Sequence, residues 1–219
     1  MRKNWGKTPF GIFNAITHLL FGWPVYLLFG KTGGPKYGNT NHFWPYGAGG
    51  KVDLFPKSWK RQVLLSDVGI AGMLGVLALW AKATSLKTVG LMYGLPYLVT
   101  NFWLVLYTWL QHTDVDVPHF DSKDWNYIKG AFHTIDRPYG KLLNFLHHNI
   151  GSTHVAHHVN PTIPHYHAKE VTEILKDKYP ELYLYDPTRI HEALWRVSTN
   201  CIGTKKMKDR DGMHVWQGV

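Results

Sequence analysis

Cysteine is almost absent from this 219-residue chain, which contains only Cys201. A single thiol excludes an intrachain disulfide framework and a cysteine-rich zinc module. Charged residues are also scarce, at 18% of the chain, whereas 45% are hydrophobic and 15% aromatic. Intrinsic disorder requires the opposite balance, so the composition excludes a disordered chain. The length suffices for one good-sized domain or two small ones.

Several catalytic motifs are missing as well. The chain has no GxSxG elbow, no HExxH and no glycine-rich phosphate motif, and Cys201 lies in an apolar helical stripe. Nucleophilic catalysis and a zinc metalloprotease are therefore poor fits. Acidic residues number 15 against 24 Lys and Arg, which gives a net charge of +9. Such a charge suits nucleic acid or a membrane surface. The sequence contains no nucleic-acid-binding motif, so we expect no nucleic-acid partner.

Formal charge is missing from three long stretches, 8–30, 68–81 and 88–111. A helix needs about 20 predominantly apolar residues to cross a bilayer. The stretch 88–111 meets this requirement and ends in Trp and Tyr, which is typical of interface anchors. The second stretch reaches the length when it is extended back to residue 62. We predict transmembrane helices over 62–81 and 88–111, with a soluble core helix as the alternative for 62–81.

The placement of Lys and Arg predicts the topology of this hairpin. Its two charge-rich flanks share one side, and the short loop with Lys82 and Lys87 lies on the other, so the flanks are expected in the cytosol. We interpret the stretch 8–30 as an interfacial or re-entrant segment, because Gly22-Trp23-Pro24 interrupts it. The predicted fold is mainly α: a membrane hairpin followed by a cytosolic, helical, histidine-rich cap over 112–219.

The remaining segments have weaker signals. Residues 31–61 are rich in Gly, Pro and aromatics and are expected to form a loop near the membrane. We predict a short helix over 125–132 and a longer one over 141–158. Two short amphipathic helices are predicted in the tail, the second beginning at Asp186-Pro187. Their apolar faces consist of Val171, Ile174 and Leu175, and of Ile190, Leu194, Val197 and Cys201.

Histidine is the residue type in excess, with 14 copies. Ten of them fall within 112–167, where even spreading would place about four. In HVAHH, His154, His157 and His158 have the spacing i, i+3, i+4 and share one face of a helix. Three imidazoles on one face can bind one or two ions of Fe, Zn, Cu or Ni. The alternative is a set of solvent-facing or mutually hydrogen-bonded histidines.

His112 directly follows the long apolar stretch, so its imidazole is expected at the cytosolic membrane boundary within reach of a metal site. An interfacial helix cap is the alternative. Three carboxylates, Asp114, Asp116 and Asp136, are candidates to accept hydrogen bonds from ligand histidines and so to fix which ring nitrogen faces the metal. The alternative for them is loop capping or a solvated charge.

On these motifs the chain resembles the membrane-bound fatty acid desaturases, with the microsomal delta-12 (oleate, omega-6) type most similar. The matching stretches are TWLQHTDVDVPHFD at 108–121, GAFHTIDRPYG at 130–140, HHNIGSTHVAHH at 147–158 and IPHYHAKEVTEILKDKYPELYLYDPTRIHEALWR at 163–196. Weaker similarity extends through GWPVYLLFG and VLLSDVGI, so the resemblance covers most of the chain.

The resemblance implies a di-iron oxidoreductase of the endoplasmic reticulum membrane, with its histidine boxes facing the cytosol. It implies a fatty acyl lipid substrate, dioxygen as co-substrate, and cytochrome b5 or a similar carrier as electron donor. HVAHH matches the third histidine box, so His154, His157 and His158 would be iron ligands, and His112 matches a further ligand position. Around them, His148, His165 and His167 are expected to support the ligands, together with Asp114.

Two earlier boxes of the family, HxxxH and HxxHH, have no match here, because only His18 and His42 precede residue 112. We therefore expect the C-terminal half of a desaturase fold, and we expect the chain alone not to hold a competent di-iron centre. The alternatives are a same-family acyl hydroxylase, and a truncated, non-catalytic membrane paralogue that binds lipid or pairs with a full-length desaturase.

Overall fold

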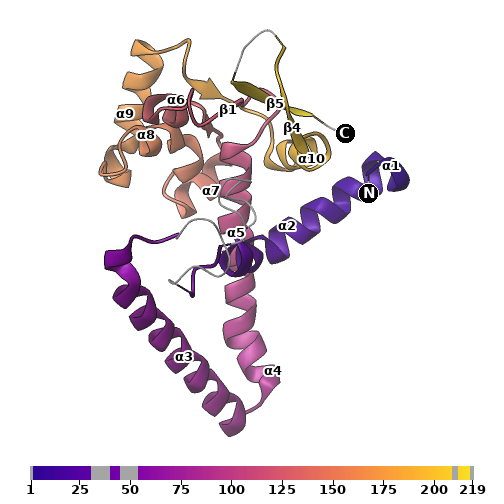
Figure 1. Ribbon diagram of the computed structural model, residues 1–219, viewed down its shortest axis with the longest axis vertical. Coiled ribbons are helices and arrows are strands. Elements are labelled where there is room, and N and C mark those ends of the chain that lie inside the picture. The colour runs from indigo at the N-terminus through magenta and orange to yellow at the C-terminus, as the bar shows by residue number, and fades with distance from the viewer. Residues whose placement is uncertain (1, 31–39, 45–53, 209–211, 218–219) are drawn as a thin grey trace. The chain divides into compact units, whose positions relative to one another are not determined.

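A computed structural model of the protein describes residues 2–30, 40–44, 54–208 and 212–217. The structure is mostly helical, as predicted (Figure 1). The chain divides into two compact units, one formed by Thr17–Val105 and the other by Met1–Ile16 together with Leu106–Val219. Most of the predicted loop over 31–61 lies outside the described residues.

The predicted membrane hairpin is present as two long helices that meet at a turn (Figure 1). The first is α3 (Lys60–Ala83), and the second runs through α4 (Leu86–Val89), a π-helical stretch (Gly90–Gly94) and α5 (Leu95–His112). Ser85 begins the second helix, because its hydroxyl accepts a hydrogen bond from the Thr88 amide at 3.0 Å. Both helical stretches have the length and apolar composition needed to cross a membrane.

The N-terminal apolar stretch forms one continuous helix, α2 (Lys7–Phe29), so the predicted interruption at residues 22–24 is wrong. Pro24 lacks an amide hydrogen and leaves the carbonyl of Leu20 without its helical partner. The side-chain amide of Asn101 donates to this carbonyl at 3.2 Å and to that of Leu19 at 2.6 Å. Replacing a lost backbone bond in this way is how apolar helices tolerate proline.

The continuity of α2 also gives it the length and composition of a membrane-crossing helix, although the sequence favoured an interfacial segment. Gly22 permits the close approach of α5, because a Cβ at this position would lie 3.2 Å from the Val105 side chain. The interfacial placement of 8–30 stays a prediction.

Replacing Asn101 with Leu should destabilise the helix pair Thr17–Phe29 and Leu95–Val105, because the Leu20 carbonyl would lose the side-chain amide that donates to it in an apolar setting. The expected cost is about 1–2 kcal/mol of unfolding free energy. Unfolding by SDS in mixed micelles measures this cost. Val99→Ala, at an exposed position of the same helix, is the control. A loss no larger than that of the control would contradict the assignment.

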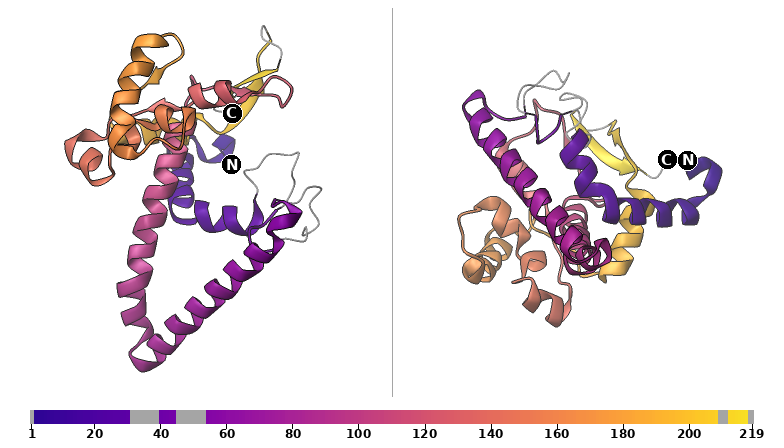
Figure 2. Two further views of the ribbon diagram at one scale, coloured as in Figure 1. Left: turned by 90° about the vertical axis from the view of Figure 1, so that its left-hand side faces the viewer. Right: turned by 90° about the horizontal axis from the view of Figure 1, so that it is seen from below.

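The second unit combines short helices with two small sheets (Figure 2). An antiparallel sheet has the strand order β1-β5-β4, and β2 pairs with β3 in parallel. These strands were not predicted. Besides the ends of α2 and α5, the helices and strands of this unit are, in chain order, α1 (Arg2–Trp5), β1 (His119–Phe120), α6 (Tyr127–Phe132), β2 (Ile135–Asp136), α7 (Gly140–Leu146), α8 (His154–Val159), α9 (His165–Lys178), β3 (Leu184–Tyr185), α10 (Ile190–Asn200), β4 (Gly203–Lys206) and β5 (Met213–Gln217).

The prediction of one helix over 141–158 is wrong. The segment forms two helices, α7 and α8, and a 3₁₀ turn (Ile150–Ser152) lies between them. His148 and Asn149 between them are left-handed, with φ of 52° and 61°. Asn is among the non-glycine residues that adopt this conformation most readily, so the helix can be interrupted here. The carbonyl of Asn149 then accepts hydrogen bonds from the Ser152 and Thr153 hydroxyls.

The apolar core of this unit lies between α6, α8 and α9. Phe132, Val155, Ala156 and Leu175 are buried there, with Val159, Val171 and Tyr183 packed against them. The short helix predicted over 125–132 and the amphipathic helix before residue 178 are thereby confirmed. The last helix, α10, begins at Ile190 and not at the predicted Asp186-Pro187, because the Asp186 carboxylate is bound elsewhere.

Candidate metal centre

Three imidazoles meet at one point of the second unit. His112 is the last residue of α5, while His154 and His158 stand one turn apart on α8. The Nε2 atom of His154 lies 3.0 Å from Nε2 of His112 and 3.0 Å from Nε2 of His158. All three candidate ligand atoms lie within 4.8 Å of one another. Two nitrogens bound to one ion at about 2.1 Å lie about 3 Å apart, so this spacing fits a shared metal ion.

The protonation states also suit a metal. Burial, followed by the charges of the neighbouring imidazoles, lowers the pKa of His154 to about 2. Burial and then the proximity of His157 lower the pKa of His158. Both rings are therefore neutral at pH 7, which leaves nitrogen lone pairs free for a metal ion. A set of neutral imidazoles fits iron, and by chemistry alone also fits zinc or copper.

The fourth predicted ligand, His157, is exposed and lies beside this cluster. Its ring centroid is 5.9 Å from that of His154 and 5.4 Å from that of His158. Among the described residues, the three-histidine cluster is the group with metal-ligand spacing. A ligand role for His157 stays a prediction.

Asp136 determines where α8 begins. Its carboxylate accepts a hydrogen bond from the Val155 amide at 2.9 Å and another from the Tyr183 hydroxyl at 2.5 Å. Thr153, the residue before this helix, makes no capping hydrogen bond with its side chain, and its hydroxyl donates to the Asn149 carbonyl. Burial raises the pKa of Asp136, and these hydrogen bonds oppose the rise. Asp136 thus supplies a side-chain acceptor for an amide of the first turn of α8, as an N-terminal cap does.

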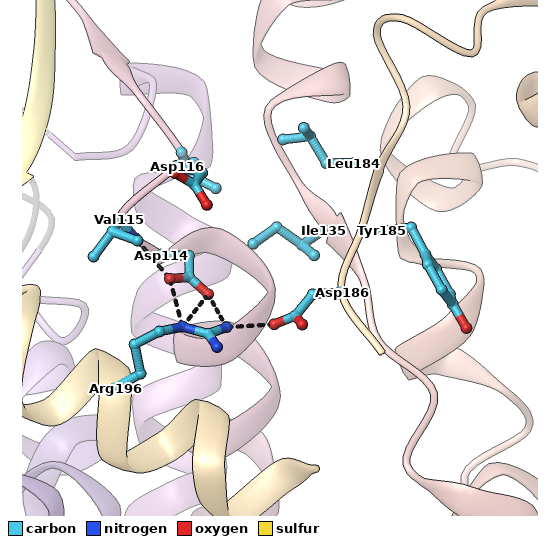
Figure 3. Close-up of a pocket in the computed structure, with 9 residues that line it drawn as sticks. Asp114, Val115, Asp116, Ile135, Leu184, Tyr185, Asp186 and Arg196 are labelled. Carbon is cyan, nitrogen blue, oxygen red and sulfur yellow. Dashed lines mark hydrogen bonds and ion pairs between the residues drawn. The ribbon is translucent and has the colours of Figure 1, made fainter. Parts of the chain in front are cut away.

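A second set of buried charges fixes the chain just beyond His112. The Arg137 side chain is fully buried, and its guanidinium forms ion pairs with Asp114 and, at 2.9 Å, with Asp186. Arg196 of α10 binds the same two carboxylates at 2.6 and 2.5 Å. Figure 3 shows Arg196 between Asp114 and Asp186. We call these four residues, two acids and two bases, the charge network.

The charge network borders a pocket of about 260 Å³. Burial alone would raise the pKa of Asp186. Hydrogen bonds from Thr188 and Arg137 outweigh this effect and lower the pKa to about 2. Asp114 binds arginines in this structure, so its predicted role beside a ligand histidine stays a prediction. The lining residues are Asp114, Val115, Asp116, Val117, Ile135, Leu184, Tyr185, Asp186 and Arg196.

Two of the three other predicted histidines, His148 and His165, form a separate pair with their ring centroids 4.7 Å apart. The third, His167, lies 3.5 Å from the Glu170 carboxylate. None of these three belongs to the three-histidine cluster. Sequence reasoning did not find Arg137, Tyr183 or Arg196. The only signal in the sequence is the adjacent Asp136-Arg137 pair between apolar and proline neighbours.

Comparison with known proteins now places the chain. The family model for fatty acid desaturases matches residues 7–189. The chain belongs to the fatty acid desaturase family. It is 39% identical to a delta(12)-fatty-acid desaturase of Vernicia fordii over 200 residues. These residues make up 91% of this chain and 51% of the relative. Identity to a delta(12) fatty acid desaturase of Mortierella isabellina is 42% over 191 residues, or 87% and 46% of the two chains.

A third relative of this chain has a different printed activity. It is an oleoyl-12-hydroxylase of Ricinus communis, 40% identical over 200 residues, which cover 91% of this chain and 50% of the relative. The chain therefore spans about half the length of the curated relatives it matches. The predicted delta-12-type family assignment is confirmed.

Replacing Asp136 with Ala should leave the α8 amide and the Tyr183 hydroxyl without their acceptor. We expect a loss of about 2–3 kcal/mol in unfolding free energy and a fall of about 10- to 100-fold in metal affinity. Asp136→Asn, which keeps one oxygen acceptor, should be intermediate. Titration of the chain with Co²⁺, followed by absorbance, measures the affinity. Equal affinity in Asp136→Ala and the parent chain would contradict the positioning role.

The charge network makes stability depend on pH in a defined window. Because the folded pKa of Asp186 is about 2, below the ordinary 3.8, its ionised form stabilises the fold fully above pH 4. This contribution should disappear as the pH falls from about 4 to about 2. Asp186→Asn should therefore cost about 2 kcal/mol at pH 7 and less towards pH 2. Denaturant unfolding measures this cost. The control is Asp177→Asn, because Asp177 forms an exposed ion pair with Lys178. A cost independent of pH would be inconsistent with this assignment.

Proposed function

We propose that this chain contributes an iron-binding half-site to O2-dependent fatty acyl desaturation. The observation that carries the proposal is the meeting of three imidazoles at the end of a helix long enough to cross a membrane. A metal held there would lie at the surface of a bilayer, where acyl lipids are the available substrate. The family membership supports the same chemistry.

The proposed reaction converts oleate to linoleate. Two hydrogen atoms leave adjacent methylenes, and dioxygen is reduced to two waters with these two hydrogens, two electrons from a carrier and two protons from water. Unactivated C–H bonds resist acid–base and nucleophilic attack, so bound iron would supply the oxidising power. We propose cytochrome b5 or a similar protein as the carrier, and the endoplasmic reticulum membrane as the location, with the histidine-rich region facing the cytosol.

The residues of this chain would bind and position the metal. His112, His154 and His158 would be ligands of one iron, and His157, on the exposed side of α8, would serve a second. Asp136 would keep the ligand-bearing helix in place through its amide hydrogen bond. The charge network would hold the segment after His112, so that the two ligand-bearing elements keep their spacing before metal arrives.

A second candidate is acyl hydroxylation, because the oleoyl-12-hydroxylase of Ricinus communis is as similar to this chain as the desaturases are. Both reactions begin by removing hydrogen from the same kind of methylene. A third candidate is a non-catalytic lipid-binding paralogue, which the half-length match to the relatives keeps open.

The test expresses two proteins in yeast membranes: this chain alone, and a fusion in which the N-terminal half of the Mortierella isabellina relative precedes it. Four candidate ligands cannot fill two oxygen-activating sites, so the chain alone should hold fewer than two irons and form no linoleate. The fusion should form linoleate, and His154→Ala in the fusion should abolish it. His191→Ala, at an exposed site, is the matched control.

Product analysis separates the candidates. Hydroxyoleate from the fusion would favour the hydroxylase, and a folded, iron-containing fusion with neither product would favour the non-catalytic paralogue. Two irons per chain with turnover in the chain alone would overturn the half-site proposal.

A further inference from the structure

The short helix α7 exposes an apolar face. Leu142, Phe145 and Leu146 are 70%, 78% and 55% exposed. Their spacing of i, i+3 and i+4 places them on one side of the helix. Ile150, just beyond α7, is also 44% exposed. Large apolar side chains gathered in this way usually mark an interaction surface.

Three contacts tie this region to the last turns of α5. The Tyr139 ring, before α7, lies 4.9 Å from the Tyr107 ring. The His147 ring, after α7, forms a hydrogen bond with the Tyr107 hydroxyl. Further along, the Gln111 side-chain amide donates to the Ile150 carbonyl at 3.1 Å. Both ends of α7 therefore lie at the level of Tyr107, beside α5 (Figure 1).

This level is on the membrane side of His112. Tyr107 precedes His112 by five residues, or about 7.5 Å along a helix that rises 1.5 Å per residue. The apolar residues of the same helix continue from there in the direction of Leu95. If α5 crosses a bilayer and ends at His112, a helix beside Tyr107 lies at the depth of the lipid interface.

We propose that α7 lies in the membrane interface and inserts Leu142, Phe145 and Leu146 among the lipid acyl chains. The partner is the lipid bilayer itself, because the exposed apolar residues of α7 lie at the level of Tyr107 on a helix long enough and apolar enough to cross a membrane. Lys141 is exposed at the border of this face, and its side chain can extend to head-group phosphates. The residues directly after α7 include His154 and His158, so this helix would set the height of the metal-binding histidines above the lipid.

The proposal is tested by placing a fluorescent label on α7. The full chain contains one thiol, Cys201, which is buried, and burial raises its pKa to about 12, so the parent chain gives a low labelling baseline. Phe145→Cys and Leu142→Cys would each be labelled with an environment-sensitive maleimide dye. Asp177→Cys is the control, at an exposed position near the end of α9.

The labelled chains would be reconstituted into vesicles of phosphatidylcholine with a minority of phosphatidylserine. At positions 142 and 145 we expect emission shifted to the blue, several-fold protection from aqueous iodide and strong quenching by nitroxide-labelled lipids. The label at position 177 should show the reverse. Using two α7 positions guards against a single variant that fails to fold, which thermal unfolding would reveal.

Two results would overturn the proposal. Iodide access at 142 and 145 equal to that at 177 would mean that the face is exposed to water. Protection from iodide without quenching by nitroxide lipids would mean that protein, such as a second copy of the chain, covers it. The experiment measures no turnover, so its outcome is independent of the proposed catalytic function.

Discussion

The spacing between the ligand-bearing elements depends on two consecutive residues, Asp136 and Arg137. In an extended segment neighbouring side chains point to opposite sides. Asp136 binds the amide end of α8, which carries His154, and Arg137 binds Asp114, two residues beyond His112. Strand β2 and the residue directly after it, Arg137, therefore connect both sides of the histidine cluster. Gly151 lets this segment approach closely, because a Cβ there would lie 2.7 Å from the Arg137 carbonyl.

The membrane helices could be predicted closely from sequence, because their signal is local. A run of residues without charge and of sufficient length identifies α3 and α5, whatever else the chain does. Pro24 was misinterpreted for the complementary reason. Its effect on α2 depends on Asn101, which is 77 positions away in sequence and supplies the missing hydrogen bond. No local pattern contains this information.

The candidate site divides in the same way. The i, i+4 spacing of His154 and His158 correctly predicted a shared face, and the position of His112 at the end of an apolar run predicted its place at the site. His157 was grouped with them by spacing, but it lies on the exposed edge of α8. The role of Asp136 could not be predicted, because it depends on where α8 begins, and the left-handed residues His148 and Asn149 interrupt the helix that the sequence predicts there. The strands were missed because each is two to five residues long and pairs with a distant partner.

The charge network is electrically self-balanced, since two carboxylates meet two guanidinium groups. The surplus of nine positive charges must therefore be carried by the rest of the chain. At physiological ionic strength, dissolved salt largely screens the interaction between exposed charges that are more than about 8 Å apart. It screens buried ion pairs much less. Ionic strength can thus weaken the attraction of this chain for anionic lipid while leaving the geometry around His112 intact. Ionic strength therefore acts on the attraction of the chain to lipid, whereas acid pH acts on the charge network that holds the segment after His112.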